Sequence, residues 1–370
     1  MNKREQIQKD ALDIALKHRR CGLGISMGVG KTLIGLKYIN HFQLNNMEKL
    51  KVLVVAPKLS IFQSWKDDAE KFNVDISKVE FTTYLSLHKQ NPYNYDLVIL
   101  DECHSLLMSH TEFLAHYTGR ILGLTGTPPR WKNSEKGEMV EKYCPIVYKY
   151  ITDDAISDEI LNDYRIMVYL IPLDTTKNVK VELKNGSFWT SEFESYYYWT
   201  TRVNEATSPK TKQISSVLRM KQMQEYKSKE RFAKLLLTLT SNKCILFANT
   251  QEQAERLCSY SYHSNNPDSE ENLKAFSEGK IDKLSCVLQL NEGINIPGLK
   301  EGIIMHSYGN ERKSSQRIGR LLRLNPTETS TIHILCFKNT VDEKWVKDAL
   351  KDFDQTKISY LNKDEQVLNF

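Results

Sequence analysis

The sequence of 370 residues predicts an α/β protein with two doubly wound parallel-sheet domains and a small β-hairpin and helical insertion between them. Two observations support this fold class. Short, continuous apolar runs, typical of strands covered on both faces, alternate with segments of helical periodicity. Polar residues follow many of these runs, as expected where ligands bind at the carboxyl ends of parallel strands. The alternation predicts domains over 1–135 and 208–370, with the insertion over 136–207.

The composition is that of an ordinary globular protein, with 40% hydrophobic and 26% charged residues. No apolar run approaches the roughly 18 residues that a membrane span needs, and the first residues lack the apolar core of a secretory signal. We therefore expect a cytoplasmic protein. The seven cysteines are scattered and form no C-x-x-C pair, so we expect neither a disulfide framework nor a zinc site.

The first predicted domain begins with a helix over 4–20, whose apolar residues recur at helical spacing. After an apolar run over 21–25 and a Gly-rich turn, a second helix is predicted over 31–42. Further strands are expected over 51–57, 79–84, 97–100 and 120–124, and a further helix over 60–72. This order is typical of a parallel sheet with crossover helices.

The turn Gly28-Val29-Gly30-Lys31-Thr32 joins an apolar run to a helix, an arrangement that wraps backbone N–H groups around a polyphosphate. In such a loop Lys31 reaches the terminal phosphates and Thr32 holds Mg²⁺. Because Ile25 occupies the first glycine position of the strict pattern, a Gly-rich turn with an incidental lysine remains the alternative.

Asp101 and Glu102 follow a predicted buried strand. There Asp101 can hold Mg²⁺ through its water shell, and Glu102 can accept a proton from an attacking water. On the first helix, either Gln6 or Gln8 can read an adenine edge through its amide.

The middle segment has a different pattern, with a long strand over 164–173 and a hairpin over 179–186. Aromatic residues crowd it between 188 and 199. We favour a small satellite core, since aromatics dominate cores, over a surface on which nucleic-acid bases stack.

The second predicted domain resumes the α/β alternation without a phosphate loop of its own, so it would share the nucleotide of the first. Its strands are expected over 244–248, 284–290, 301–307 and 331–337, and its helices over 251–259, 270–278, 313–324 and 341–353. The net charge is only +5, and basic residues concentrate in one helical stretch over 210–234. That stretch is either a solvated helix face or a phosphate-contacting stripe.

A basic helix begins near Gln316 in this domain, and it carries Arg320 and Arg323 three residues apart. This spacing makes the two guanidinium groups neighbours, which can neutralise charge on a departing γ-phosphate across a cleft. Taken singly, these residues also fit an exposed basic helix.

With these segments in place, the chain resembles a superfamily 2 helicase or translocase of DExH type with two RecA-like domains, and the resemblance covers nearly the whole sequence. The residues similar to motifs I, Ia, II, III, IV, V and VI are 26–32, 54–65, 101–104, 124–128, 246–250, 291–298 and 316–323. Ile25 in place of a small residue and Asn295 in place of the common aspartate depart from the family pattern.

The resemblance implies roles for particular residues, with ATP and Mg²⁺ as cofactors. The catalytic set would be Lys31, Asp101, Glu102, Gln316, Arg320 and Arg323. Nucleotide would contact Gln8, Gly28, Val29, Gly30, Lys31 and Thr32, and Mg²⁺ would contact Thr32 and Asp101. Coupling between ATP and movement would use His104, Thr125 and Thr127, with Gln316 helping to relay the nucleotide state. Nucleic acid would lie along Lys58, Thr83, Asn249, Thr250 and Glu292.

The resemblance is closer to phage UvsW-type and Swi/Snf-type DNA motors than to DEAD-box RNA helicases, and the compact size suggests a viral or mobile-element origin. We therefore expect a monomeric, ATP-dependent DNA helicase or translocase that acts on duplex, forked or branched DNA in replication or recombination. The alternatives are an RNA helicase, the motor subunit of a nuclease or restriction assembly, and a binding module that has lost hydrolysis.

Overall fold

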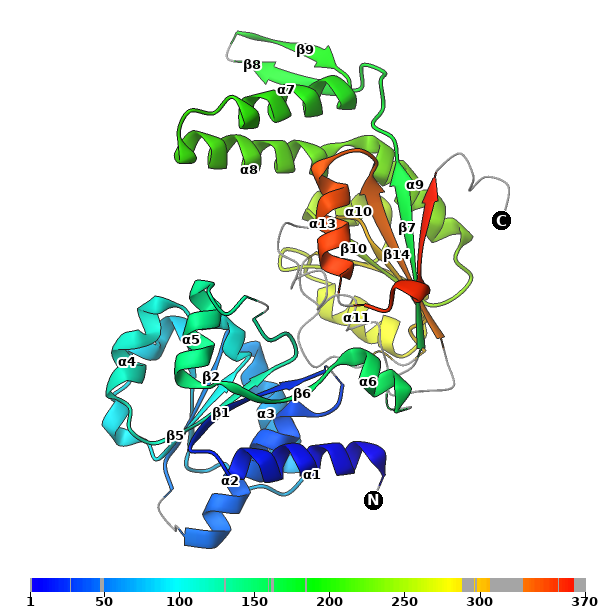
Figure 1. The fold of residues 1–370 in the computed structure, drawn as a ribbon. Helices are drawn as coiled ribbons and strands as arrows, with labels where there is room; N and C mark the ends of the chain where they lie inside the picture. Colours follow the sequence, from blue (N-terminus) through cyan, green and yellow to red (C-terminus); the bar gives the residue numbers. More distant parts are fainter. Residues whose placement is uncertain are drawn as a thin grey trace. The chain divides into compact units, whose positions relative to one another are not determined.

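The computed structural model describes residues 2–26, 28–46, 50–129, 131–158, 160, 163–183, 185–287, 296, 298–306, 329–351 and 353–362. These residues form two compact units, and the division along the chain falls between Asp163 and Tyr164. Each unit has its own sheet with helices around it (Figure 1). The predicted fold class, two doubly wound α/β domains, is confirmed.

The first unit contains a six-stranded sheet in the order β3-β2-β4-β5-β1-β6, in which every neighbouring pair is parallel. The strands are β1 (Arg20–Ile25), β2 (Val52–Ala56), β3 (Val79–Thr83), β4 (Leu97–Asp101), β5 (Arg120–Thr125) and β6 (Ile146–Tyr150). All residues of β2 and β4 are buried, as their continuous apolar sequences predict.

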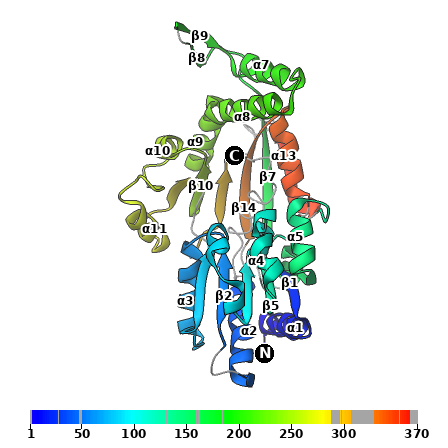
Figure 2. The same cartoon turned by 90° about the vertical axis from the view of Figure 1, so that its left-hand side faces the viewer.

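Helices cover both faces of this sheet (Figures 1 and 2). They are α1 (Lys3–Leu16), α2 (Lys31–Asn46), α3 (Ser60–Lys71), α4 (Thr111–His116) and α5 (Glu135–Tyr143), and the short helix α6 (Thr152–Ser157) follows β6. Short 3₁₀ turns connect the strands at η1 (Tyr84–Lys89), η2 (Pro92–Asn94), η3 (Cys103–Ser105) and η4 (Met108–His110). Alternate residues of β4 point to opposite faces of the sheet. On one face, Val98 and Leu100 belong to a hydrophobic core cluster that also contains residues of α4 and α5.

The second unit contains a seven-stranded sheet in the order β11-β12-β10-β13-β14-β7-β15. The strands are β7 (Asp163–Ile171), β10 (Cys244–Ala248), β11 (Ser261–Tyr262), β12 (Lys283–Val287), β13 (Glu301–Ile304), β14 (Thr329–Phe337) and β15 (Ile358–Asn362). The helices packed around it include α9 (Lys227–Leu239), α10 (Gln251–Leu257), α11 (Ser269–Ser277) and α13 (Val341–Leu350), with the turn η5 (Gln355–Lys357) before β15. The helix predicted over 313–324 lies outside the described residues.

The segment predicted as an insertion is divided among different parts of the structure. β6 completes the first sheet, whereas β7 lies between β14 and β15 in the second. A strand pattern in the sequence shows that a segment is extended but not which strand it pairs with, so these memberships were not predicted. The hairpin β8 (Val179–Leu183) and β9 (Gly186–Thr190) forms a separate two-stranded sheet and is followed by α7 (Glu192–Asn204).

The predicted basic stretch consists of two helices rather than one, because α8 (Pro209–Glu225) ends before Tyr226 and α9 begins after it. Helix α7 packs along α8, next to the hairpin, as Figures 1 and 2 both show. Tyr196 of α7 and Met223 of α8 reach into the core of the second unit.

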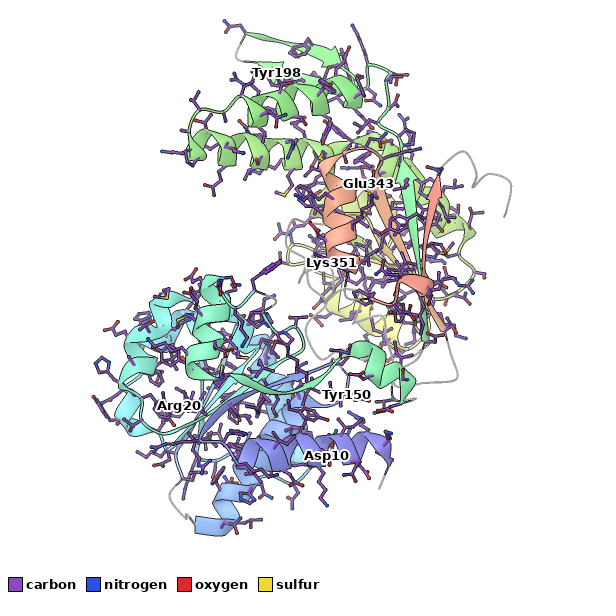
Figure 3. All side chains as sticks on the ribbon, in the orientation of Figure 1. Asp10, Arg20, Tyr150, Tyr198, Glu343 and Lys351 are labelled. Carbon is purple, nitrogen blue, oxygen red and sulfur yellow. The ribbon has the colours of Figure 1, made fainter. Side chains whose placement is uncertain are left out.

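The satellite core that we favoured for the aromatic residues is wrong for most of them. Tyr196 is buried, and its hydroxyl accepts a hydrogen bond from the Val341 N–H. Five other aromatics are exposed, between 48% and 63%: Phe188, Trp189, Phe193, Tyr197 and Tyr198. Figure 3 labels Tyr198 on α7. A two-stranded hairpin next to one helix has too little surface to cover so many rings, which the sequence count alone does not reveal.

Candidate ATP site

The loop between β1 and α2 contains two glycines in backbone conformations that favour glycine. Gly28 and Gly30 have φ angles of 84° and 101°, in a region that glycine adopts without steric cost. Ile25, the departure from the family pattern, is fully buried as the last residue of β1. Its side chain therefore belongs to the core of the first unit, so the isoleucine at this position affects the packing of that core. Met27 lies outside the described residues.

Helix α1 is tied directly to this loop. The carbonyl of Val29 accepts hydrogen bonds from Gln8 Nε2 at 2.7 Å and from Arg4 Nε at 3.1 Å. Gln8 Oε1 in turn accepts one from Lys37 Nζ at 3.2 Å. A side chain at Gly30 would bring its Cβ within 2.7 Å of Gln8 Nε2, so only glycine permits this approach.

The two candidate adenine readers lie in different surroundings. Gln8 is buried beside the loop, whereas Gln6 bonds Asp10 on its own helix at 2.6 Å. Arg4 was not predicted as part of the site, although it lies one helical turn before Gln8, and that spacing on one helix was the available signal.

Lys31 and Glu102 face each other across the site. Lys31 Nζ lies 3.9 Å from Glu102 Oε1, and the two side chains are 12% and 11% exposed. Glu102 directly follows β4 and has a φ of 49°, an uncommon conformation for a residue with a side chain. Such backbone conformations cluster at functional sites.

The pKa of Glu102 is the result of opposing effects. Burial raises it, but the positive charge of Lys31, the hydrogen bond and charge of His104, and the Gly126 N–H together outweigh burial and lower the pKa to about 2. Glu102 is therefore ionised at neutral pH. An ionised carboxylate can orient a water molecule and accept its proton.

Asp101, the last residue of β4, is held on several sides. Its Oδ2 accepts a hydrogen bond from Trp65 Nε1 at 2.8 Å, and its Oδ1 accepts one from the Glu102 N–H at 3.0 Å. The Tyr84 hydroxyl donates to the Asp101 carbonyl at 3.0 Å. Asp101 itself is 7% exposed.

His104 joins the predicted motif II to motif III. Its Nδ1 lies 2.8 Å from Thr125 Oγ1 and 3.3 Å from Glu102 Oε2. Thr127 completes the cluster, because its N–H donates to Thr125 Oγ1 at 3.1 Å and its Oγ1 lies 3.5 Å from His104 Nδ1. The three predicted coupling residues therefore form one polar network that includes Glu102.

The side-chain atoms of this site that could coordinate a metal ion are oxygens. Within the described part of the chain, no group of three or more His, Cys, Asp or Glu side chains forms a metal cage. Thr32 supplies a hydroxyl and Asp101 a carboxylate. Mg²⁺ is usually held by one or two such oxygens together with water and substrate phosphates, so the donor set fits this ion.

The predicted nucleic-acid residues are only partly described. Lys58 is exposed just before α3, and Thr83 is the last residue of β3. Asn249 and Thr250 follow β10, where the Thr250 hydroxyl caps α10 through the Gln253 N–H at 3.2 Å. Four predicted residues lie outside the described ranges: Glu292, Gln316, Arg320 and Arg323. Asn295, the second departure from the family pattern, lies outside them as well.

Two family models match the chain. Residues 2–130 match the family described as type III restriction enzyme, res subunit, and residues 227–325 match the helicase conserved C-terminal domain. The first match contains the loop, Asp101, Glu102 and His104. The second contains the residues predicted as motifs IV, V and VI.

Characterised relatives match most of the chain at low identity. The DNA 3'-5' translocase XPB2 of Sulfurisphaera tokodaii is 22% identical over 368 residues, which cover 90% of this chain and 82% of the relative. The transcript termination protein A18 of Yaba-like disease virus is also 22% identical, over 88% of this chain and 69% of its own length.

Solved structures share the fold. The DNA-bound type ISP restriction-modification enzyme LlaBIII matches 98% of this chain with a TM-score of 0.64 at 14% identity, and the chain spans only 31% of that enzyme. The Hef helicase domain of Pyrococcus furiosus matches 92% of this chain and 96% of its own length, with a TM-score of 0.53 at 15% identity.

The loop geometry, the ionised Glu102 beside Lys31, the two parallel sheets and the two family matches agree with one another. Among the described residues, no helix is long and apolar enough to cross a membrane. The two family matches and the relatives support a superfamily 2 helicase with two RecA-like domains that hydrolyses ATP.

Proposed function

We propose that this chain is an ATP-dependent DNA helicase or translocase that moves along duplex, forked or branched DNA. The observation that carries the proposal is the pairing of Lys31 with the buried Glu102 at 3.9 Å, beside a loop in which Gly28 and Gly30 have positive φ angles. The choice of DNA is supported by the relative named as a DNA 3'-5' translocase and by the neighbour whose structure is bound to DNA.

In the proposed reaction, the backbone N–H groups of Gly28, Val29 and Gly30 bind the phosphates of ATP. Lys31 turns from Glu102 towards the terminal phosphates, and Glu102 then receives the proton of the attacking water. When Lys31 is drawn away, one of the charges that lower the pKa of Glu102 is shared with the nucleotide, so Glu102 becomes a stronger base. This exchange of partners would link ATP binding to activation of the base.

Mg²⁺, held by Thr32 and Asp101, would neutralise phosphate charge when bound. Gln8 would contact the adenine while it holds the loop through Val29. Gln316, Arg320 and Arg323 are proposed from the resemblance to complete the site from the second domain, with the two arginines stabilising the charge that develops on the γ-phosphate.

The network of His104, Thr125 and Thr127 is proposed to couple hydrolysis to movement. Its support is that His104 bonds motif III through Thr125 and also lies 3.3 Å from the base Glu102. A change in the charge or position of Glu102 on ATP turnover would therefore alter the hydrogen bonds of His104, Thr125 and Thr127, and with them the segment that follows β5.

For nucleic acid, we propose the track formed by Lys58, Thr83, Asn249, Thr250 and Glu292. The exposed rings of β9 and α7 are proposed to add a stacking surface. Lys180 and Trp189 are cross-strand partners in the hairpin, and Arg202 lies 6.0 Å from the ring of Tyr198. Exposed rings beside cationic side chains are the combination that binds unpaired bases.

A motor subunit of a restriction assembly is the second candidate. The family match over residues 2–130 and the partial coverage of LlaBIII favour it, as does a TM-score of 0.61 over 96% of this chain with an HsdR subunit fragment of a type I restriction enzyme from Vibrio vulnificus. A nuclease or methyltransferase subunit that co-purifies with the chain would support this candidate, and a monomer active alone on DNA would support the first.

The test is ATP hydrolysis measured without nucleic acid and with duplex DNA, forked DNA, single-stranded DNA and RNA of matched length. We expect stimulation by DNA, strongest with forked or duplex substrates if the chain acts in replication or recombination. Stimulation by RNA alone would replace the proposal with an RNA helicase. The absence of hydrolysis under every condition would indicate a binding module.

A further inference from the structure

Trp65 is a fully buried residue of α3 whose indole reaches the end of a different element. Its side chain has no exposed surface, and Nε1 donates a hydrogen bond of 2.8 Å to Oδ2 of Asp101, 36 residues later in the chain. A buried indole N–H needs an acceptor, and a backbone carbonyl would satisfy that need. Here the acceptor is the carboxylate that the proposed function assigns to Mg²⁺.

Space for the indole comes from Gly35 in α2, the helix that begins with Lys31. A Cβ on Gly35 would lie 2.4 Å from Trp65 Cη2 and 3.2 Å from Leu124 Cδ1. Real Cβ atoms do not approach this closely, so a side chain at Gly35 would displace the ring. The ring is therefore fixed between the helix after the phosphate loop and strand β5.

Among the described residues, Trp65 and the backbone of Glu102 both donate hydrogen bonds to the carboxylate of Asp101. Oδ1 accepts a hydrogen bond from the backbone N–H of Glu102, and Oδ2 accepts one from the indole N–H of Trp65. Together these bonds set the rotation of the carboxylate plane, because each oxygen is held by a donor in a fixed direction. A carboxylate oxygen has two lone pairs, so the bond that it accepts from the protein does not prevent it from accepting another from water.

We propose that Trp65 is a positioning residue for Mg²⁺: it holds the Asp101 carboxylate in the orientation that receives the hydrated ion with its nucleotide. This inference rests on the proposed function. Hydrogen-bond partners behind metal-binding side chains typically contribute about 10- to 100-fold to metal affinity. Trp65 thus sets how strongly Mg²⁺ enhances nucleotide binding without itself touching the nucleotide.

The experiment compares the binding of a fluorescent ADP analogue in excess Mg²⁺ and in EDTA, by anisotropy read at the wavelength of the analogue. The variants are Trp65→Phe, which keeps an aromatic ring and removes the donor, and Trp131→Phe, the same change at a 68% exposed tryptophan of the first unit. Asp101→Asn is the reference. For Trp65→Phe we expect unchanged affinity in EDTA and about 10-fold less enhancement by Mg²⁺. Trp131→Phe should equal the unsubstituted protein.

The outcomes separate the inference from the proposed function. If Asp101→Asn keeps the full enhancement by Mg²⁺, Asp101 does not hold the ion and the proposed site is wrong. If Asp101→Asn loses the enhancement but Trp65→Phe keeps it, only the role of Trp65 is overturned. An equal loss for Trp65→Phe in EDTA and in Mg²⁺ would make the residue merely structural.

A second variant keeps the test decisive if Trp65→Phe unfolds. Benzothienylalanine at position 65 has the shape of tryptophan with sulfur in place of the N–H, so it fills the same space without a donor. We expect the same selective loss of the enhancement by Mg²⁺, at an unchanged melting temperature in EDTA. Full enhancement with this residue would overturn the inference.

Discussion

Lys31 Nζ lies 3.9 Å from Glu102 Oε1, so the lysine of the phosphate loop and the carboxylate that follows β4 face each other in the first unit. Burial opposes ionisation of Glu102, and the charge of Lys31 is the largest of the effects that overcome it and lower the pKa. The charge of Lys31 therefore helps to keep Glu102 ionised, and we expect this pairing to change if a phosphate competes for the lysine.

Replacing Glu102 by glutamine should separate ATP binding from hydrolysis. The amide keeps the shape of the side chain but cannot take a proton from water, so we expect turnover to fall by about 100-fold or more. Binding of a fluorescent ATP analogue should persist, because Glu102 does not hold the phosphates. Steady-state hydrolysis and equilibrium binding check the two expectations. Turnover within about twofold of the unsubstituted enzyme would show that another group is the base.

The pH dependence of stability should report the low pKa of Glu102. A carboxylate with a lowered pKa in the folded state contributes stability that is fully present above its unfolded pKa, about 4.3, and is lost as pH falls towards its folded pKa of about 2. Between about pH 5 and 2, the free energy of unfolding should therefore fall less steeply in Glu102→Gln than in the unsubstituted protein. Urea unfolding across this range measures the difference, and parallel curves would contradict the assignment.

A side chain at Gly35 should disturb the first unit through Trp65. The methyl group of Gly35→Ala would collide with the indole, and overpacking of this kind costs about 1–3 kcal/mol, more than the ~1 kcal/mol that alanine gains over glycine in a helix. Thermal unfolding should therefore show a lower melting temperature for this variant.

The control for Gly35→Ala is Leu44→Ala, which also places alanine in α2 but at a position that is 77% exposed. Its melting temperature should stay close to that of the unsubstituted protein, because little packing is lost at an exposed position. An unchanged or higher melting temperature for Gly35→Ala would show that the indole moves freely.

The exposed rings of the hairpin should contribute to nucleic-acid binding. Phe188 and Trp189 are neighbours in β9, so they point to opposite faces of the ribbon. Replacing both by alanine should weaken binding of single-stranded DNA by about 1–3 kcal/mol for each stacked base that is lost. Hydrolysis without DNA should not change, because the hairpin belongs to neither of the two large sheets.

Tyr93→Ala is the matched control, since Tyr93 is 72% exposed in η2 of the first unit and is assigned no contact with DNA. Fluorescence anisotropy with labelled oligonucleotides measures the affinities. Equal affinity of the double variant and the Tyr93→Ala protein would limit the hairpin to another role.

Much of the first unit could be predicted from the sequence because its signals are local. The continuous apolar runs of β2 and β4 and the glycines at positions 28 and 30 each specify their own conformation. Asp101 and Glu102 were placed correctly at the end of β4, because the end of an apolar run marks the end of its strand.

The remaining features depend on contacts between distant segments. The partners of β7, the bond from Trp65 to Asp101, and the bond from Arg4 to Val29 join residues far apart in sequence. The spacing of apolar residues along the sequence does not indicate which distant residues will pair. The exposure of Phe188 and Trp189 escaped prediction for the same reason, since burial depends on what else packs nearby.

The central claim is that ATP hydrolysis at Lys31 and Glu102 moves the chain along DNA. Displacement of a triplex-forming third strand from duplex DNA tests it most directly, because it reports movement whether or not the duplex strands separate. We predict ATP-dependent displacement by the unsubstituted protein and none by Lys31→Ala or Glu102→Gln. Vigorous DNA-stimulated hydrolysis without any displacement, or displacement that survives in Lys31→Ala, would contradict the account.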